Sequence, residues 1–316
     1  MPARTADRVV SLKDAISGIQ NGWNLTFGGF AHSLAPMALI REILRAGKRD
    51  LDLIGVAECW AADLLAGGGA LRRVRFSNFM FEGLGRCRNF CRGVEGGTIL
   101  VEDHSHLGTS SRLAAAGLGL PFLPVRSMMG SDIFNVPGFE QPEAKWAKVA
   151  DPFGGPPVTV MSAVSPDAAI LHAQRADRMG NIQVFGTTAV MEEQARAAQR
   201  VIVSVEEIVD AEELRSNPGA TLLPSFMVDA VVELPFGAHP TGTYGYYEHD
   251  QAHMARYYAA TRGQESFDGY LEEWVFGPRD HWAYLDKIGI ARLLGLRVDP
   301  KLGYIPRHRG EGGARP

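Results

Sequence analysis

The residues best suited to chemistry stand together in the segment Glu102-Asp103-His104-Ser105-His106. An apolar run at 98–101 comes directly before Glu102 and predicts a strand that ends at this polar cluster. In open α/β sheets, ligands bind beyond the carboxyl ends of the strands. A carboxylate at that position can act as a nucleophile or a base in acyl chemistry, where anhydrides and thioesters form and break. It can equally cap the next helix or anchor hydrogen bonds, and the residues alone leave both roles open.

A second candidate site lies in the segment 21–36, which reads NGWNLTFGGFAHSLAP. A short apolar strand at 25–27 runs into Gly28, Gly29 and Phe30, and Pro36 stands where a helix begins. Paired glycines allow the backbone to approach a ligand closely, because no Cβ atom blocks the way. A strand, a glycine-rich turn and a helix N-terminus can together hold an anion or an oxyanion. The alternative is an ordinary tight turn between a strand and a helix.

Metal binding is the other chemistry that this polar segment could support. His104 and His106 are ligand types for a divalent ion, and Asp103 lies beside them. No second cluster of Cys or His completes a site at a suitable spacing, so we predict no metal centre.

The elements that must position these residues follow an alternating pattern. Apolar runs at 24–28, 52–56, 74–76, 98–101, 168–171 and 201–205 predict strands, and helical patterns occur at 12–20, 36–47, 58–68 and 111–119. Strands without polar interruption belong to a sheet that is covered on both faces. The alternation predicts an α/β fold with a mainly parallel sheet flanked by helices. After residue 250 the patterns are helical and rich in aromatic residues, and we expect these helices to cover the sheet or a subunit interface.

We predict a single domain over residues 1–304, with an irregular insertion at about 131–157 and a flexible tail at 305–316. The insertion is rich in Pro and Gly, which is typical of a long functional loop or a subdomain boundary. The tail is basic and Gly-rich, as frayed ends often are.

Composition excludes several classes of protein. The chain of 316 residues has a net charge of −4 and no basic run, which argues against nucleic acid as a partner. It has no apolar stretch of membrane-spanning length and no signal-peptide pattern, and its three cysteines fit a reducing compartment, so we expect a cytoplasmic protein. The absence of P-loop, GxGxxG and GxSxG motifs disfavours nucleotide phosphate transfer, dinucleotide redox chemistry and serine hydrolysis.

The glycine segment resembles the signature of family I coenzyme A transferases, in which Gly-Gly-Phe follows a short apolar run and Pro comes six residues later. The family usually has Gly two residues before that Pro, where this chain has Leu34. Further segments resemble, in order and spacing, the α subunits of the glutaconate CoA-transferase type: LKDAI, VEDHS, AAAGLGLPFLPV, VDAVVELPFGAHP, EEWVF and LGY.

The resemblance implies the NagB/RpiA/CoA-transferase type of fold and the α subunit of a heteromer, α2β2 or larger. Such enzymes move CoA between an acyl-CoA and a free carboxylic acid through an enzyme–CoA thioester, with coenzyme A as substrate and no permanent cofactor. The family's β subunit carries the catalytic glutamate in a Ser-Glu-Asn-Gly-like motif, which this chain lacks; Glu58 and Glu82 have other neighbours. The residues then expected to line the pocket are Gly28, Gly29, Phe30, Glu102, Ser105, Gly130 and Ser131.

Two alternatives remain open. The chain could belong to a hydrolase of the same fold that opens a ring or cleaves a C–C bond in a CoA ester, with the chemistry at Glu102 or Asp103. It could also be a partner subunit that binds CoA esters without catalysing a reaction.

Overall fold

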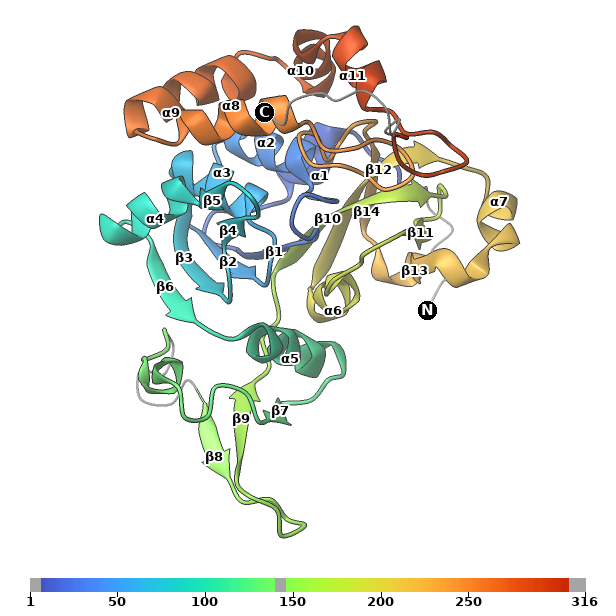
Figure 1. The fold of residues 1–316 in the computed structure, drawn as a ribbon. Coiled ribbons are helices and arrows are strands. Elements are labelled where there is room, and N and C mark those ends of the chain that lie inside the picture. The colour runs from blue at the N-terminus through green and yellow to red at the C-terminus, as the bar shows by residue number, and fades with distance from the viewer. Residues whose placement is uncertain (1–6, 140–145, 307–316) are drawn as a thin grey trace.

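A parallel sheet organises the molecule, for which a computed structural model describes residues 7–139 and 146–306 (Figure 1). Within these ranges the strands follow the order β6-β3-β2-β1-β10-β12-β14, and each neighbouring pair is parallel. Two short strands, β11 and β13, extend the sheet antiparallel beside the end of β10. The bounds are β1 (Asn24–Phe27), β2 (Leu51–Gly55), β3 (Leu71–Phe76), β6 (Leu100–Asp103), β10 (Ala168–Ala176), β11 (Ile182–Gln183), β12 (Arg200–Ile208), β13 (Thr221–Leu223) and β14 (Ala230–Glu233).

The two faces of the sheet are covered by different helices, as the apolar strands predicted. Successive residues of a strand point to opposite faces. Leu25 and Ile170 pack with α1 (Leu12–Ser17), α2 (Met37–Arg45), α3 (Trp60–Gly67) and α4 (Arg88–Glu95). Ala169 and Leu171 pack on the other face with α6 (Met191–Ala197). The mainly parallel, doubly covered sheet is therefore confirmed.

The C-terminal helices form a further layer outside the first group. They are α8 (Gln251–Ala260), α9 (Gln264–Leu271), the π-helical turn η4 (Glu272–Phe276), α10 (His281–Ile288) and α11 (Ile290–Leu296). They pack on α2 and α3, and the buried hydroxyl of Tyr257 donates to Asp63 at 2.8 Å. These helices share one core cluster with strand residues such as Ile170 and Val232, and they reach the sheet over α2 and α3. A role at a subunit interface stays a prediction.

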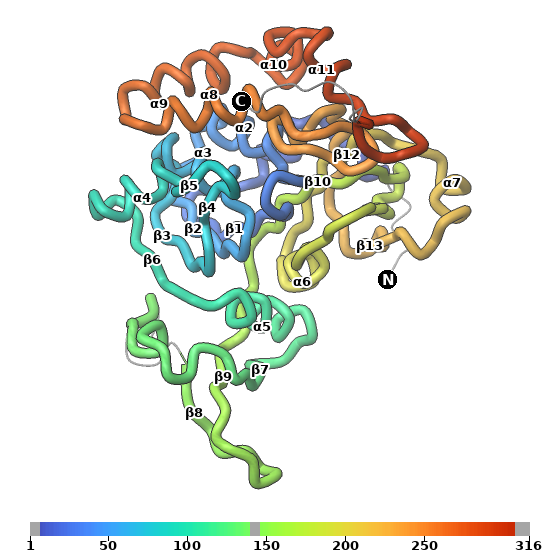
Figure 2. The backbone as a smooth tube through the Cα atoms, in the orientation of Figure 1, coloured from blue at the N-terminus to red at the C-terminus, as the bar shows by residue number. Residues whose placement is uncertain are grey.

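The segment between β6 and β10 leaves the sheet and forms an arm (Figure 2). It contains α5 (His106–Gly117) and a small antiparallel sheet of β7 (Phe122–Val125), β9 (Val158–Ser162) and β8 (Ala147–Val149). The predicted insertion at 131–157 falls in this arm, and its described residues are largely irregular but also form η1 (Asp132–Asn135) and β8. Most of the predicted tail lies outside the described residues.

The remaining elements are short. They are β4 (Met80–Phe81), β5 (Gly85–Arg86), α7 (Ala211–Ser216), η2 (Pro218–Ala220) and η3 (Ser225–Met227). None of the helices in the described ranges combines the length and the apolar composition that a membrane span needs.

Candidate functional site

The candidate residues gather at one edge of the sheet, here called the carboxyl edge. It is formed by the ends of β1, β2, β3 and β6, which are parallel neighbours and therefore end side by side. Gly28 follows β1, Glu58 lies beyond β2, Ser77 follows β3, and Glu102 is near the end of β6. The topology thus brings together residues that are far apart in the sequence, at the edge where α/β sheets bind their ligands.

The glycine turn after β1 is tight and conformationally demanding. Gly29 has φ +105°, and a Cβ atom there would lie 2.9 Å from the backbone nitrogen of Ala35. Phe30 and Ser33 exchange backbone hydrogen bonds of 2.9 Å, which closes the turn, and the Phe30 side chain is exposed. A residue with a side chain at position 29 would need both a strained φ and a shift of the neighbouring backbone.

Two further residues of this turn have positive φ without being glycine. They are Ala31, with φ +53°, and Leu34, with φ +58°. Leu34 occupies the position where the family resemblance expected glycine, and its side chain is fully buried. The chain therefore keeps the left-handed backbone at this position and adds an apolar contact to the core, at the cost of steric strain.

Glu102 is the centre of a buried charged cluster. Its carboxylate accepts hydrogen bonds from His104 Nε2 at 2.6 Å, Arg112 Nη1 at 2.9 Å and the backbone N–H of Phe139 at 2.7 Å, and Arg75 lies 3.5 Å away. Burial alone would raise the pKa of Glu102, but the bonds to His104 and Phe139 and the charge of Arg75 outweigh it and lower the pKa to about 2. The group is a permanent anion, and a carboxylate with such a pKa is a weak base at neutral pH.

Ser105 and the segment around Gly130 lie next to this cluster. Ser105 is the N-cap of α5, where its hydroxyl accepts from the N–H of Gly108 at 2.9 Å and pairs with the hydroxyl of Ser127 at 2.5 Å. Gly130 has φ +82°, and the hydroxyl of Ser131 donates to the carbonyl of Met128 at 2.7 Å. The structure thus brings Ser105 and the 127–131 loop together.

The helix after β6 begins earlier than predicted. The apolar pattern placed its start at 111, whereas α5 starts at His106. Ser105 supplies a cap that allows the helix to begin among polar residues, and the polar first turn hides the helical period from a pattern of apolar residues. The two histidines point to different partners: His104 binds Glu102, and His106 Nδ1 lies 2.9 Å from the hydroxyl of Ser77. No group of three metal-ligating side chains occurs among the residues that the structure describes.

Glu58, which the sequence analysis rejected as the family's catalytic glutamate, also lies at this edge. Its buried carboxylate accepts from the backbone N–H groups of Trp60 at 2.7 Å and Ala61 at 2.9 Å, at the N-terminus of α3. Burial raises the pKa of Glu58 to about 8, against the lowering effect of these bonds. The signal in the sequence was a carboxylate at the start of the predicted helix 58–68, on the carboxyl side of an apolar strand. This residue, unlike Glu102, carries a proton at neutral pH.

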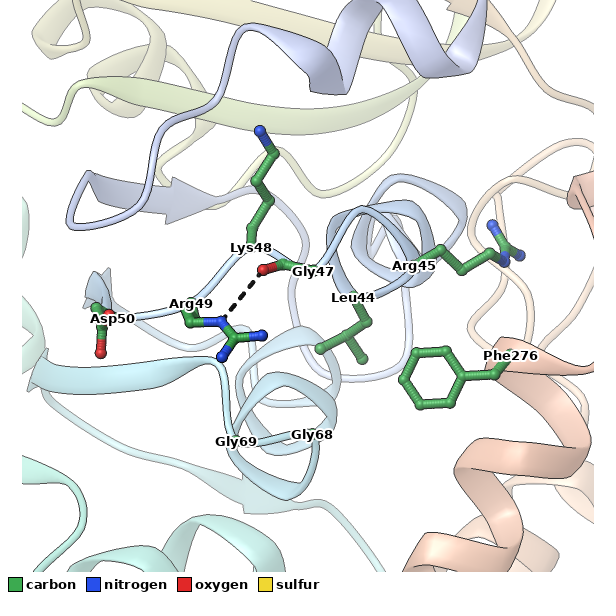
Figure 3. A pocket seen from close by; sticks show the side chains of 9 residues that line it. All are labelled: Leu44, Arg45, Gly47, Lys48, Arg49, Asp50, Gly68, Gly69 and Phe276. Atoms are coloured by element: carbon green, nitrogen blue, oxygen red, sulfur yellow. Dashed lines mark hydrogen bonds between the residues drawn. The ribbon is translucent and has the colours of Figure 1, made fainter.

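A cavity of about 620 Å³ lies away from this edge (Figure 3). It is formed where α2 ends and β2 begins, and its lining includes Leu44, Arg49, Gly69 and Phe276. Lys48, which also lines it, donates to the backbone carbonyl of Ser17 at 3.3 Å. The cavity opens beside the amino end of β2, so it is separate from the candidate site.

Comparison with known proteins identifies the family to which the chain is similar. Residues 9–234 match the family described as coenzyme A transferase. The chain is 36% identical to the A subunit of glutaconate CoA-transferase from Acidaminococcus fermentans over 94% of this chain and 97% of that protein. It is 34% identical to the A subunit of 3-oxoadipate CoA-transferase from Pseudomonas knackmussii, over 89% and 98% of the two chains. A longer uncharacterized protein from Archaeoglobus fulgidus is 38% identical, and the matched region of 292 residues spans 64% of its length.

Solved structures and a more distant relative extend the comparison. The crystal structure of the Acidaminococcus glutaconate CoA-transferase superposes with a TM-score of 0.89, over 94% of this chain and 98% of that chain. A cysteine-to-serine variant of the decarboxylase AibA/AibB, 35% identical, gives a TM-score of 0.73 over 84% and 99% of the two chains. The cholesterol ring-cleaving hydrolase IpdA subunit from Rhodococcus jostii is 28% identical over 87% of this chain and 94% of that protein.

Proposed function

The chain belongs to the coenzyme A transferase family, and from this premise we propose that it is the α-type subunit of a two-subunit enzyme in the cytoplasm. The enzyme moves CoA between an acyl-CoA and a free carboxylic acid. One observation carries the proposal: the match to the A subunit of glutaconate CoA-transferase extends over nearly the whole of both chains, in sequence and in structure. The second subunit is a β-type partner, because the similar transferases are named as A subunits.

The nucleophile of the proposed reaction comes from the partner. A glutamate carboxylate attacks the thioester carbonyl, and CoA leaves as its thiolate, so that a mixed anhydride forms. The thiolate then attacks the carbonyl carbon of the anhydride that comes from the glutamate. The substrate acid leaves as its carboxylate, and an enzyme–CoA thioester remains. A free carboxylic acid takes CoA by the reverse of these steps.

This chain contributes an oxyanion donor from its glycine turn. The N–H of Gly28 donates to the carbonyl of Ile170 at 3.0 Å, and that of Phe30 donates to Ser33 at 2.9 Å. Within residues 7–139 and 146–306, the N–H of Gly29 donates no hydrogen bond. We assign this free N–H to the developing oxyanion, because a fixed donor at that point stabilises charge that appears only in the transition state.

Glu102 positions the pocket wall in this mechanism. Its carboxylate joins β6, α5 through Arg112 and the 136–139 segment through the N–H of Phe139. Ser105, Gly130 and Ser131 then form the adjoining wall. A permanent anion of this kind suits a structural anchor better than a proton acceptor.

The test is CoA exchange by the complex of this chain with the β-type subunit of the same organism. The complex is incubated with glutaconyl-CoA and acetate, treated with borohydride or hydroxylamine, and analysed by mass spectrometry. A modified glutamate on the β subunit, together with CoA exchange, supports the transferase. A complex that forms without an adduct and without exchange rejects it.

A second candidate function is hydrolysis of a cyclic CoA ester. The similarity to the ring-cleaving hydrolase favours it. The discriminating observation is whether the β subunit has its catalytic glutamate. Where that glutamate is absent and the complex hydrolyses the ester, Glu102→Gln should abolish the hydrolysis. A complex that binds CoA esters but converts none of them would support the non-catalytic role instead.

A further inference from the structure

The small sheet of the arm has two faces of different composition. Neighbouring residues in an antiparallel pair lie on the same face, and the pairings define both sets. One set, here called the outward face, is Phe122, Pro124, Ala147, Val149, Val158, Val160 and Ser162. The other set, the inward face, is Leu123, Val125, Lys148, Thr159 and Met161.

The inward face is packed against the chain itself. Met161 and Thr159 are buried, and Met161 forms a core cluster with Met128 and Trp146. Lys148 places its ammonium group 5.0 Å from the ring centre of Phe134. This face is therefore complete within the chain.

The outward face is apolar and open to solvent. Six of its seven residues are apolar, Phe122 is 48% exposed and Val149 is 38% exposed. The loop that joins β8 to β9 carries Phe153, which is 96% exposed. Strands that face water on one side normally alternate apolar and polar residues, with the polar ones outward. A contiguous apolar face of this kind is typical of a protein interface.

We propose that the outward face is the docking surface for the β-type subunit. The arm projects away from the body of the molecule (Figure 1). Helix α5 packs on β7 and β9, and its Arg112 binds Ser162 at one end of the outward face, whereas Phe122 and Val149 stay exposed. The arm is also continuous with the candidate site, since Ser105 of the site pairs with Ser127 and Glu102 binds the backbone of Phe139. A subunit seated on this face therefore lies beside the carboxyl edge, where the proposed mechanism needs its glutamate. The inference rests on the proposed two-subunit function.

Two substitutions on the outward face test this surface. Phe122→Glu and Val149→Glu each place a charge on the interface without changing the inward face. The affinity of the chain for the β-type subunit, measured by surface plasmon resonance, should fall at least about 30-fold for each, as for other central interface residues. Phe226→Glu on η3 is the matched control, because this phenylalanine is also exposed but lies outside the arm and the C-terminal layer, and its affinity should stay that of the wild type. Thermal unfolding of each isolated variant checks that the fold is kept.

The outcomes separate the surface from the function. Unchanged affinity of folded Phe122→Glu and Val149→Glu chains overturns the docking surface. Self-association of the isolated chain through Phe122 and Val149, measured by sedimentation, would also overturn it if the affinity for the β-type subunit stays unchanged in the variants. If the wild-type complex forms and these variants weaken it, but no CoA exchange occurs, the transferase function fails and the docking surface stands.

Discussion

At the scale of single residues, Glu102 stabilises the fold as an anion. The ordinary pKa is 4.5, and the pKa in the folded chain is lowered to about 2. This stability is therefore present above about pH 4.5 and is lost as the pH falls toward 2. We predict that Glu102→Gln lowers the free energy of unfolding at pH 7 by about 3 to 5 kcal/mol, because it leaves the guanidinium groups of Arg75 and Arg112 buried without this carboxylate. Urea denaturation measures the loss.

The pH dependence makes this prediction specific. The difference between wild type and Glu102→Gln should shrink below about pH 4.5. Glu192→Gln, which removes an exposed pair with Arg196, is the control and should change stability by less than about 1 kcal/mol. Equal losses for the two variants at pH 7 would contradict an anchoring role for Glu102.

Glu58 should give the opposite pH dependence. Its pKa is raised from 4.5 to about 8, so between these values the folded chain keeps a proton that the unfolded chain has released. Stability then falls as the pH rises, by up to about 1.4 kcal/mol per pH unit for this one group. Glu58→Gln cannot titrate, so its unfolding free energy, measured in urea at pH 5 to 8, should lack this slope. Parallel curves for the two proteins would rule out a proton on Glu58.

At the scale of elements, the turn between β1 and α2 combines strain with a free donor. Gly29→Ala forces a side chain into φ +105° and toward the backbone of Ala35. We predict a loss of about 1 to 3 kcal/mol in unfolding free energy. The CoA-exchange rate should also fall in the assembled enzyme, since the N–H of Gly29 moves.

Ala31→Gly is the matched control in the same turn. Ala31 has φ +53°, a left-handed conformation that glycine adopts without steric cost. This variant should be more stable than wild type by about 0.5 to 1 kcal/mol. Thermal unfolding measures both variants. If Gly29→Ala and Ala31→Gly are both less stable than wild type, the left-handed backbone of this turn does not explain the loss of stability.

At the scale of the whole molecule, the active unit is the heteromer. The chain lacks the Ser-Glu-Asn-Gly-type glutamate that the proposed mechanism requires. We predict that the purified chain alone exchanges no CoA between glutaconyl-CoA and labelled acetate, and that adding the β-type subunit starts the exchange. Appreciable exchange by the chain without a partner would falsify the division of labour between the subunits.

Much of the architecture was determined by the sequence itself. Apolar strands alternating with amphipathic helices predicted the doubly covered parallel sheet, because both signals depend on residues close together in the chain. The cap at Ser11, whose hydroxyl accepts from the N–H of Asp14 at 3.1 Å, is local in the same way. The Gly-Gly-Phe motif and the later segments identified the family. The sequence also placed Gly28 and Glu102 each directly after a predicted strand, and the ends of parallel strands lie at one edge of a sheet.

Only the tertiary structure decided what those residues do there. Glu102 is an anion because His104, the N–H of Phe139 and the charge of Arg75 converge on it. Phe139 and Arg75 lie 37 and 27 residues away in the sequence, so no local pattern encodes that encounter. Glu58 keeps its proton because folding removes water from it. The arm's two faces likewise depend on the register between β7, β9 and β8, since a shift of one residue exchanges the faces of a strand. Local order is set by neighbours in the chain, whereas charge, burial and exposed surface are set by contacts between distant segments.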